Sequence, residues 1–175
     1  MGIRDDEIER MKKYCAGLNI QLRFVNKPNR AHFSGVATWS PNPSEIIIYT
    51  KKHSSKTAII MSLLHEIGHN CYYSLNNKPG IPDAYSAESE RTRSSPPLLK
   101  SQRKQIYDYE RLSIVYMLPI ALELGLKIAR WKIEAQMELD TWVYAYYYEH
   151  GCFPNQIEYR DMKNEIKRKH KGSVK

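Results

Sequence analysis

Apolar residues recur at helical spacing near the N-terminus and then gather in short clusters. The spacing of Ile8, Met11 and Cys15 predicts a packing helix over residues 5–16. Three following stretches are rich in β-branched and aromatic residues and predict strands at residues 20–25, 32–39 and 45–50. A turn rich in Pro and Ser separates the last two stretches, so we expect a small antiparallel sheet.

The next helical pattern has the broadest apolar face in the chain. Ser54 or Ser55 can cap a helix that runs through residues 58–71, where apolar residues occupy most positions of one face. Such a face predicts a mostly buried helix. We expect the sheet to pack on it.

The remaining chain divides into a polar segment and a helical half. Residues 76–104 are rich in Gly, Pro, Ser and charges without apolar periodicity, which predicts a long mobile loop. A helical pattern over residues 105–149 is interrupted at Pro119, which predicts two helices. A last amphipathic segment then fades into a basic tail at residues 163–175.

Length and composition favour one domain. A chain of 175 residues with 42% hydrophobic content can bury a single core, and we assign residues 1–162 to one α+β domain. No apolar run approaches the roughly 18 residues of a membrane-spanning helix, so no membrane partner is expected. Three cysteines without a CxxC spacing argue against a disulfide framework or a thiolate zinc site. These features favour a reducing cytoplasm.

The basic charge raises a second class of function. The net charge is +8 and the pI is about 9.3, and Lys and Arg concentrate in residues 91–104 and in the tail at 163–175. Such runs are commonly solvated surface, but they can also bind a phosphate backbone weakly. A nucleic-acid-binding or scaffolding protein with a vestigial or structural metal site is therefore the alternative function.

One motif on the predicted buried helix carries chemistry. His65 and His69 lie four residues apart, so a helix presents both imidazoles to one point. Imidazole suits Zn²⁺, which lowers the pKa of a bound water to about 7, and Glu66 is placed to take the proton as general base. Two histidines and a carboxylate in a buried helix are costly unless something pairs with them. The motif predicts a zinc site that hydrolyses peptide bonds.

The third metal ligand must come from another part of the chain. Metzincin-like proteases place a histidine six residues after the second ligand, but that position is Leu75. A carboxylate on a later helix, the gluzincin arrangement, remains, and residues 130–149 offer Glu134, Glu138 and Asp140. Asp140 is rotated about 200° from Glu138 on a helix and is expected to point away. Glu134 and Glu138 stay open as the ligand.

The motif and this later helix together resemble the ImmA/IrrE-type and minigluzincin metallopeptidases of phages and mobile elements. The resemblance covers residues 45–73 and 134–145 and implies a zincin-like domain in the cytoplasm, that of the host if phage-encoded. It favours Glu138 as third ligand, because residues 138–145 are similar to the Glu-x-x-small-aromatic-x-x-Ala signature. Glu134 is then a rival ligand or orients a histidine. The strand at residues 45–49 is implied to bind extended peptide along an open edge.

Two further expectations concern the site and its partners. One of the tyrosines at positions 144 and 146–148 could donate to the oxyanion of a tetrahedral intermediate, although most are expected to be packing residues. Cys71 is expected in the core, and His32, His53 and His150 have no assigned role. The expected partner is a protein or peptide substrate, and the sequence does not define the oligomeric state.

Overall fold

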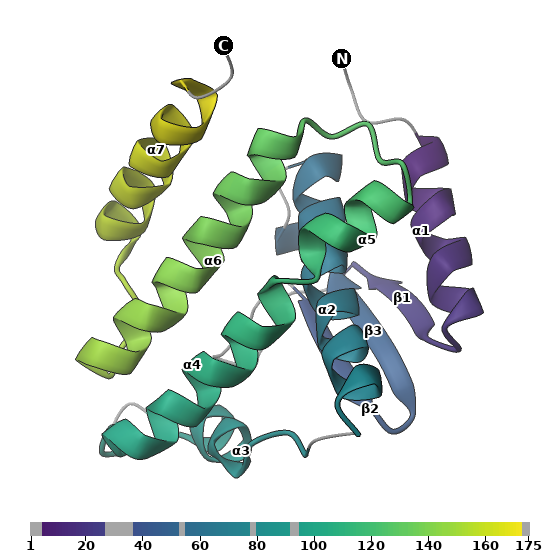
Figure 1. The fold of residues 1–175 in the computed structure, drawn as a ribbon. Helices are drawn as coiled ribbons and strands as arrows, with labels where there is room; N and C mark the ends of the chain where they lie inside the picture. Colours follow the sequence, from purple (N-terminus) through teal and green to yellow (C-terminus); the bar gives the residue numbers. More distant parts are fainter. Residues whose placement is uncertain (1–4, 27–36, 53–54, 78–79, 92–94, 173–175) are drawn as a thin grey trace.

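A computed structural model describes residues 5–26, 37–52, 55–77, 80–91 and 95–172 (Figure 1). It is an α+β structure in which helices predominate. The N-terminal elements are α1 (Asp5–Gly17), β1 (Gln21–Val25), β2 (Ala37–Pro41), β3 (Ser44–Tyr49) and η1 (Thr50–Lys52). The helical remainder comprises α2 (Lys56–Leu75), α3 (Asp83–Glu90), α4 (Lys100–Ile114), α5 (Met117–Glu123), α6 (Arg130–His150) and α7 (Gln156–Gly172).

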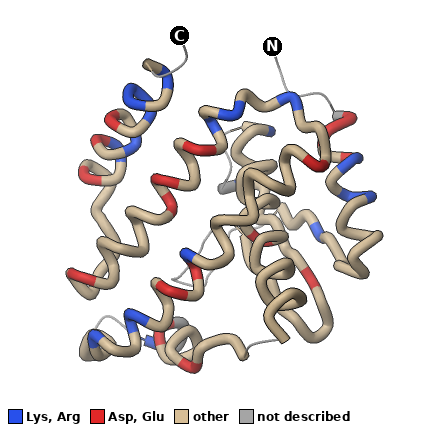
Figure 2. Tube along the Cα trace, viewed as in Figure 1, with Lys and Arg blue, Asp and Glu red and all other residues tan. Residues whose placement is uncertain are grey.

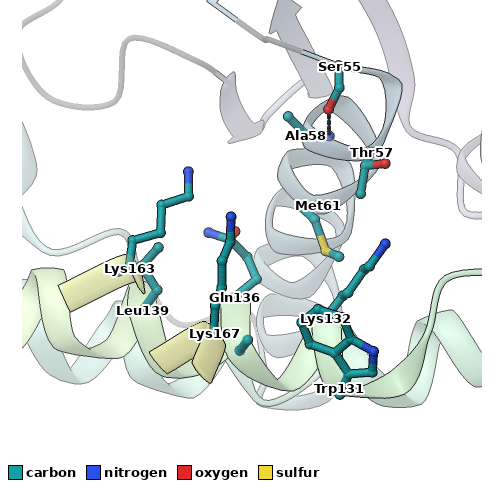
Figure 3. Close-up of a pocket in the computed structure, with 11 residues that line it drawn as sticks. Ser55, Thr57, Ala58, Met61, Trp131, Lys132, Gln136, Leu139, Lys163 and Lys167 are labelled. Atoms are coloured by element: carbon teal, nitrogen blue, oxygen red, sulfur yellow. Dashed lines mark hydrogen bonds between the residues drawn. The ribbon is translucent and has the colours of Figure 1, made fainter. Parts of the chain in front are cut away.

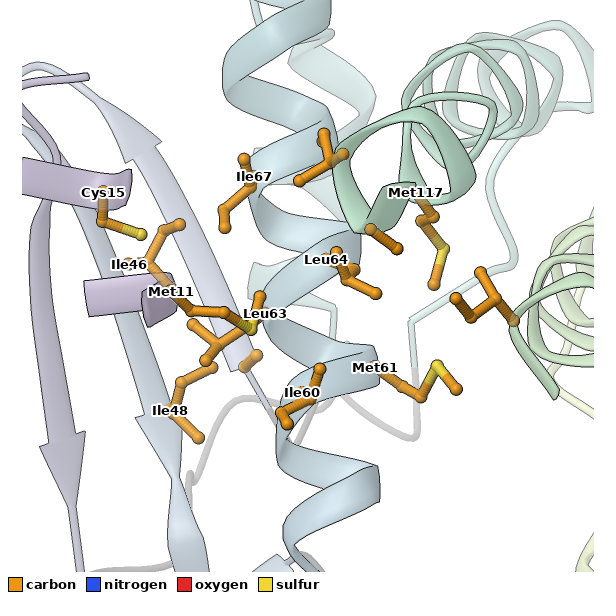
Figure 4. Close-up of a cluster of buried hydrophobic side chains, with 14 of the residues drawn as sticks. Met11, Cys15, Ile46, Ile48, Ile60, Met61, Leu63, Leu64, Ile67 and Met117 are labelled. Atoms are coloured by element: carbon orange, nitrogen blue, oxygen red, sulfur yellow. The ribbon is translucent and has the colours of Figure 1, made fainter. Parts of the chain in front are cut away.

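Helix α2 is the centre of the fold. It lies between the sheet with α1 on one side and α4, α5 and α6 on the other (Figure 1). Ser55 is its N-cap, and the side chain accepts a hydrogen bond from the backbone N–H of Ala58 at 3.2 Å. Side chains at Ile60, Leu63 and Ile67 face the sheet and α1 in a cluster of fully buried apolar residues (Figure 4). The predicted buried helix is thereby confirmed.

The sheet is mixed, so the expected antiparallel sheet is wrong in part. Its strand order is β1-β3-β2, with β2 antiparallel to β3 across the predicted turn and β1 parallel to β3. Parallel neighbours need a long connection, and here the chain runs through β2 between β1 and β3. Because β3 is paired on both sides, the expectation that it offers an open edge to peptide is also wrong.

The segment expected to be a long loop contains helical structure. Helix α3 lies within it, and α4 begins at Lys100, inside the range assigned to the loop. The apolar contacts of Ala84 with Ile106 and Tyr147 hold α3 against α4 and α6. These contacts join residues far apart in the sequence, which explains why the sequence of α3 by itself did not predict a helix.

The helical half contains one more break than expected. Helix α4 ends at Ile114, and Pro119 lies in the first turn of α5, where a missing backbone N–H is tolerated. Gly125 and Gly151 both have positive φ and end α5 and α6 respectively, as their conformational freedom allows.

The basic C-terminal residues continue a helix instead of fading into a tail. Helix α7 extends to Gly172 and packs on α6, with Ile166 buried against Ala135 and Leu139. Figure 2 shows basic and acidic residues alternating along α7, with acidic residues spaced along the neighbouring α6. The two helices are complementary in charge where Lys169 and His170 of α7 contact Glu138 of α6.

Candidate metal centre

Helix α2 brings the two predicted histidines together. The ring centroids of His65 and His69 are 5.0 Å apart, as expected for residues one helical turn apart. His69 and Glu66 are buried, with only 5% and 8% of their surfaces exposed. The two histidine rings thus lie together, and Glu66 is buried on the same helix.

The carboxylate beside the histidine pair is Glu110 of α4. Its Oε2 lies 2.8 Å from His65 Nε2 and 3.4 Å from His69 Nε2. One ligand atom from each of these three residues lies within 4.8 Å of the others, the only such group of three metal-ligating residues in the described part of the chain. Glu110 is 3% exposed, so it is a buried acid whose charge faces two imidazoles.

Gly68 explains how α4 comes close enough to supply this carboxylate. A Cβ atom at residue 68 would overlap the backbone carbonyl of Ser113, which lies one turn after Glu110 on α4. Glycine therefore lets the two backbones approach at this point. The sequence between the two histidines thus contributes to the site by admitting the helix that carries the third side chain.

The assignment of Glu138 as third ligand is corrected by this geometry. Its carboxylate faces α7, where it accepts hydrogen bonds from Lys169 Nζ at 2.8 Å and 2.9 Å and contacts His170 Nε2 at 2.8 Å. Glu134 also lies away from the histidine pair and accepts from Arg130 Nε at 2.7 Å. Both acids face a neighbouring helix, because the basic side of α7 packs on that side of α6.

Asp140, expected to point away from the metal, is the α6 acid that faces the site. Its Oδ2 lies 3.4 Å from His65 Nδ1, and its Oδ1 accepts a hydrogen bond from Gln136 at 2.7 Å. The predicted angular separation between Asp140 and Glu138 therefore holds, but Asp140, not Glu138, faces the histidine pair. A carboxylate on the far nitrogen orients the ring and favours Nε2 for the metal.

His69 is held by aromatic rings. The indole of Trp39 on β2 stacks on it with centroids 6.0 Å apart, and the phenol of Tyr109 on α4 stacks at 4.9 Å. Its Nδ1 is buried without a hydrogen-bond partner among the described residues. The two histidines are thus oriented by different means, one by a carboxylate and the other by ring contacts.

The buried charges shift one another's pKa values. Burial alone would raise the pKa of Glu110, but the imidazoles of His69 and His65 outweigh it and lower that pKa to about 2. Burial would lower the pKa of His65, yet its hydrogen bonds to Asp140 and Glu110 raise it well above the ordinary value. Burial also raises the pKa of Glu66. Glu110 is therefore ionised as a ligand must be, and Glu66 is the stronger base.

Tyr144 completes the polar side of the site. It is hydrogen-bonded to Glu110, and burial together with the charges of Glu110 and Glu66 raises the pKa of its phenol well above the ordinary value. The phenol therefore stays protonated and can donate to the Glu110 carboxylate. Of the tyrosines singled out from the sequence, this one lies at the candidate centre.

The other residues singled out lie elsewhere. Tyr147 donates to Glu88 at 2.8 Å, Tyr146 donates to Glu158 at 2.9 Å, and Tyr148 stacks on Tyr107. His150 lies against the ring of Tyr146. Cys71 packs against the main core as expected, and the positions of His32 and His53 lie outside the described residues.

The donor set fits a zinc ion in chemistry and in spacing. Two imidazole nitrogens and one carboxylate oxygen form a known zinc ligand set, and bonds of about 2.0–2.1 Å place tetrahedral ligand atoms about 3.3 Å apart. The separation between His69 Nε2 and Glu110 Oε2 is 3.4 Å. The shorter separation of 2.8 Å from His65 is that of a direct hydrogen bond, and all three ligand atoms lie within 4.8 Å of one another.

The sequence contains a signal for Glu110. The inward face of α4 consists of Ile106, Tyr109, Glu110, Ser113 and Ile114. A carboxylate in the middle of an otherwise apolar stripe needs a partner, since burying it alone is costly.

Comparison of the chain with protein-family models, with curated proteins and with solved structures gives no match. Across the helices that the structure describes, the length and apolar character needed to cross a membrane are not found together.

Proposed function

We propose that this protein is a zinc-dependent endopeptidase of the gluzincin type, with His65, His69 and Glu110 as metal ligands. The observation that carries the proposal is the meeting of these three side chains in one buried site. A buried, ionised carboxylate beside two imidazoles needs a positive charge to compensate it, either a proton on an imidazole or a bound cation. Zinc suits this donor set. The likeness to ImmA/IrrE-type and minigluzincin peptidases is part of the same proposal, with Glu110 in place of Glu138.

The roles of the chain's own residues follow from their positions. Zinc, when bound, supplies a Lewis acid that activates water and polarises a peptide carbonyl. Glu66 follows the first ligand on α2, and its raised pKa makes it the group that accepts the proton of the attacking water. Asp140 orients His65, and Tyr144 orients Glu110. These two are positioning residues.

The choice of a peptide substrate rests on the general base beside the histidines. A structural zinc site is closed by four protein ligands, whereas a catalytic site keeps one position for water. Among the described residues three side chains that could serve as ligands lie together here, and the charge of the adjacent Glu66 interacts with both imidazoles. This combination of an HExxH helix and a separate carboxylate is that of metal-assisted peptide hydrolysis.

The test separates metal binding from proteolysis. Purified protein should hold one zinc per chain by elemental analysis and cleave an unfolded protein substrate in a chelator-sensitive manner. Glu66→Gln should keep the zinc and lower the cleavage rate by about 10²–10⁴-fold, because it removes the base but no ligand. Zinc binding together with undiminished cleavage in this variant would contradict the role of Glu66. Absence of zinc binding by the wild-type chain would contradict the whole proposal.

A further inference from the structure

A cavity separate from the candidate metal centre is lined by none of the residues of that centre. It has a volume of about 320 Å³ and lies between the first turns of α2, the start of α6 and the middle of α7. Its apolar wall includes Met61, Trp131 and Leu139 (Figure 3). Its size is at the lower end of that of small-molecule sites, which combine an apolar wall with a few polar groups.

The polar groups around this cavity are cationic. Lys132, Lys163 and Lys167 line it, and Figure 3 shows their ammonium groups pointing towards the end of the pocket where α2 begins. No acidic residue occupies the first turn of α2, so the positive end of its helix dipole adds to the same field. The pocket therefore has positive charge at one end and an apolar surface along its side.

The two α7 lysines at this cavity, Lys163 and Lys167, are not neutralised by carboxylates of the described residues. Among the described residues, neither Lys163 nor Lys167 forms an ion pair, whereas the next lysine, Lys169, is paired with Glu138. Lys163 contacts the ring of Tyr159 at 5.4 Å. Partial burial and the nearby charge of Lys167 lower the pKa of Lys163, and Asp140 offsets only part of this. Two cations that repel each other at a cavity would be stabilised by an anion between them.

We propose that this pocket, defined by Met61, Trp131, Leu139 and the three lysines, binds a small organic anion with an apolar or aromatic body. The lysines would hold a phosphate or carboxylate group, and the apolar wall would cover the body of the ligand. An inorganic ion alone would leave that wall exposed, so the organic part contributes to affinity. The site depends neither on zinc nor on peptidase activity.

The test uses the full-length chain and isothermal titration calorimetry with phenyl phosphate, benzoate and inorganic phosphate as probes. Phenyl phosphate or benzoate should bind at one saturable site and more tightly than inorganic phosphate, and the tighter of the two identifies the anionic group. The double variant Lys163→Gln, Lys167→Gln should weaken binding at least about tenfold, because it removes two charged hydrogen-bond donors. Failure of both aromatic anions to saturate a site would overturn the proposal.

Matched variants separate the pocket from the general basic charge. Lys12→Gln with Lys13→Gln makes the same change of charge on α1, across α2 from the pocket (Figure 1), and should leave the affinity unchanged. Ala58→Phe should block the pocket without changing any charge, and circular dichroism would verify its fold. Equal losses in the two lysine double variants, or full affinity in folded Ala58→Phe protein, would show that the anion binds elsewhere.

Discussion

Two carboxylate–histidine pairs in this structure have the same separation and different surroundings. Glu110 lies 2.8 Å from His65 between α4 and α2, and Glu138 lies 2.8 Å from His170 between α6 and α7. The first carboxylate is 3% exposed and meets a second imidazole, while the second is 36% exposed and is also bound by Lys169. An ammonium group neutralises Glu138, whereas the only cationic partners of Glu110 among the described residues are the two imidazoles, which can also bind a metal.

The two pairs differ in burial and in the third group that contacts the carboxylate, which is His69 for Glu110 and Lys169 for Glu138. In water-exposed pairs, solvent screens the charges and the net stabilisation is small. In the buried pair, a missing cation would leave a charge without compensation. The α2–α4 contact is therefore suited to bind zinc, and the α6–α7 contact is suited to hold two helices together.

The largest effect is expected from placing a methyl group in the close contact between α2 and α4. Gly68→Ala would place a methyl group against the carbonyl of Ser113, and overpacking of this kind costs about 1–3 kcal/mol of unfolding free energy. The shift of α4 would also move Glu110, so zinc affinity should fall. Urea unfolding and zinc titration measure the two effects.

Gly17→Ala is the matched control for that variant, because a Cβ at residue 17 meets nothing within 4 Å. It should keep wild-type stability and zinc affinity. If Gly68→Ala behaved in the same way, the close approach of the two helices would not be what positions Glu110.

A smaller effect is expected at the carboxylate behind His65. Asp140→Asn should weaken zinc binding by about 10–100-fold, the usual consequence of removing a partner of a ligating histidine. Competition with a chromogenic chelator measures the affinity. Asp161→Asn removes an exposed acid of α7 that pairs with Arg160, and it should change nothing. Equal zinc affinities for the two variants would contradict the positioning role of Asp140.

The pH dependence of the metal-free protein sharpens the comparison. The lowered pKa of Glu110 stabilises the fold above its ordinary value of 4.5, and this stabilisation is lost as pH falls from 4.5 towards 2. The raised pKa of His65 stabilises the fold below its ordinary value of 6.5, and this is lost as pH rises through the raised value. The stabilisation from the pair should thus be greatest between about pH 4.5 and 6.5.

The measurement is the difference in unfolding free energy between wild-type and Glu110→Gln protein, each with a chelator present, across this pH range. The difference should decrease on both sides of the window. Glu138→Gln is the control, since the exposed pair is screened and should give a smaller and flatter difference. A difference for Glu110→Gln that continues to rise above pH 8 would contradict the protonated pairing of His65 with Glu110.

The parts of the site that the sequence predicts most directly are those within one helix. The spacing of His65, Glu66 and His69 determines their common face once α2 forms, and the apolar residues around them predict that α2 is buried. Which side of α6 faces the histidine pair depends instead on how the neighbouring helices pack on it. Basic residues of α7 face Glu138, and this made Asp140 the inward acid.

The fold shows the same division between local and tertiary information. Local signals predicted α1, the hairpin turn before β3 and the cap at Ser55. The parallel pairing of β1 with β3 depends on strands distant along the chain, and α3 depends on packing of Ala84 against other helices. Glu110 could have been found from the sequence, because an acid on an apolar helical face signals a buried partner.

The most direct measurement is the zinc content of Glu110→Gln and Glu138→Gln proteins, determined side by side after dialysis against a weak chelator. Both variants remove one negative charge, so they differ only in which pair loses it. We predict that Glu138→Gln retains one zinc per chain and that Glu110→Gln loses it, with a fall in affinity of more than about 100-fold, beyond the usual effect of an indirect partner. Retention of zinc by Glu110→Gln, or its loss from Glu138→Gln, would contradict the assignment of the third ligand.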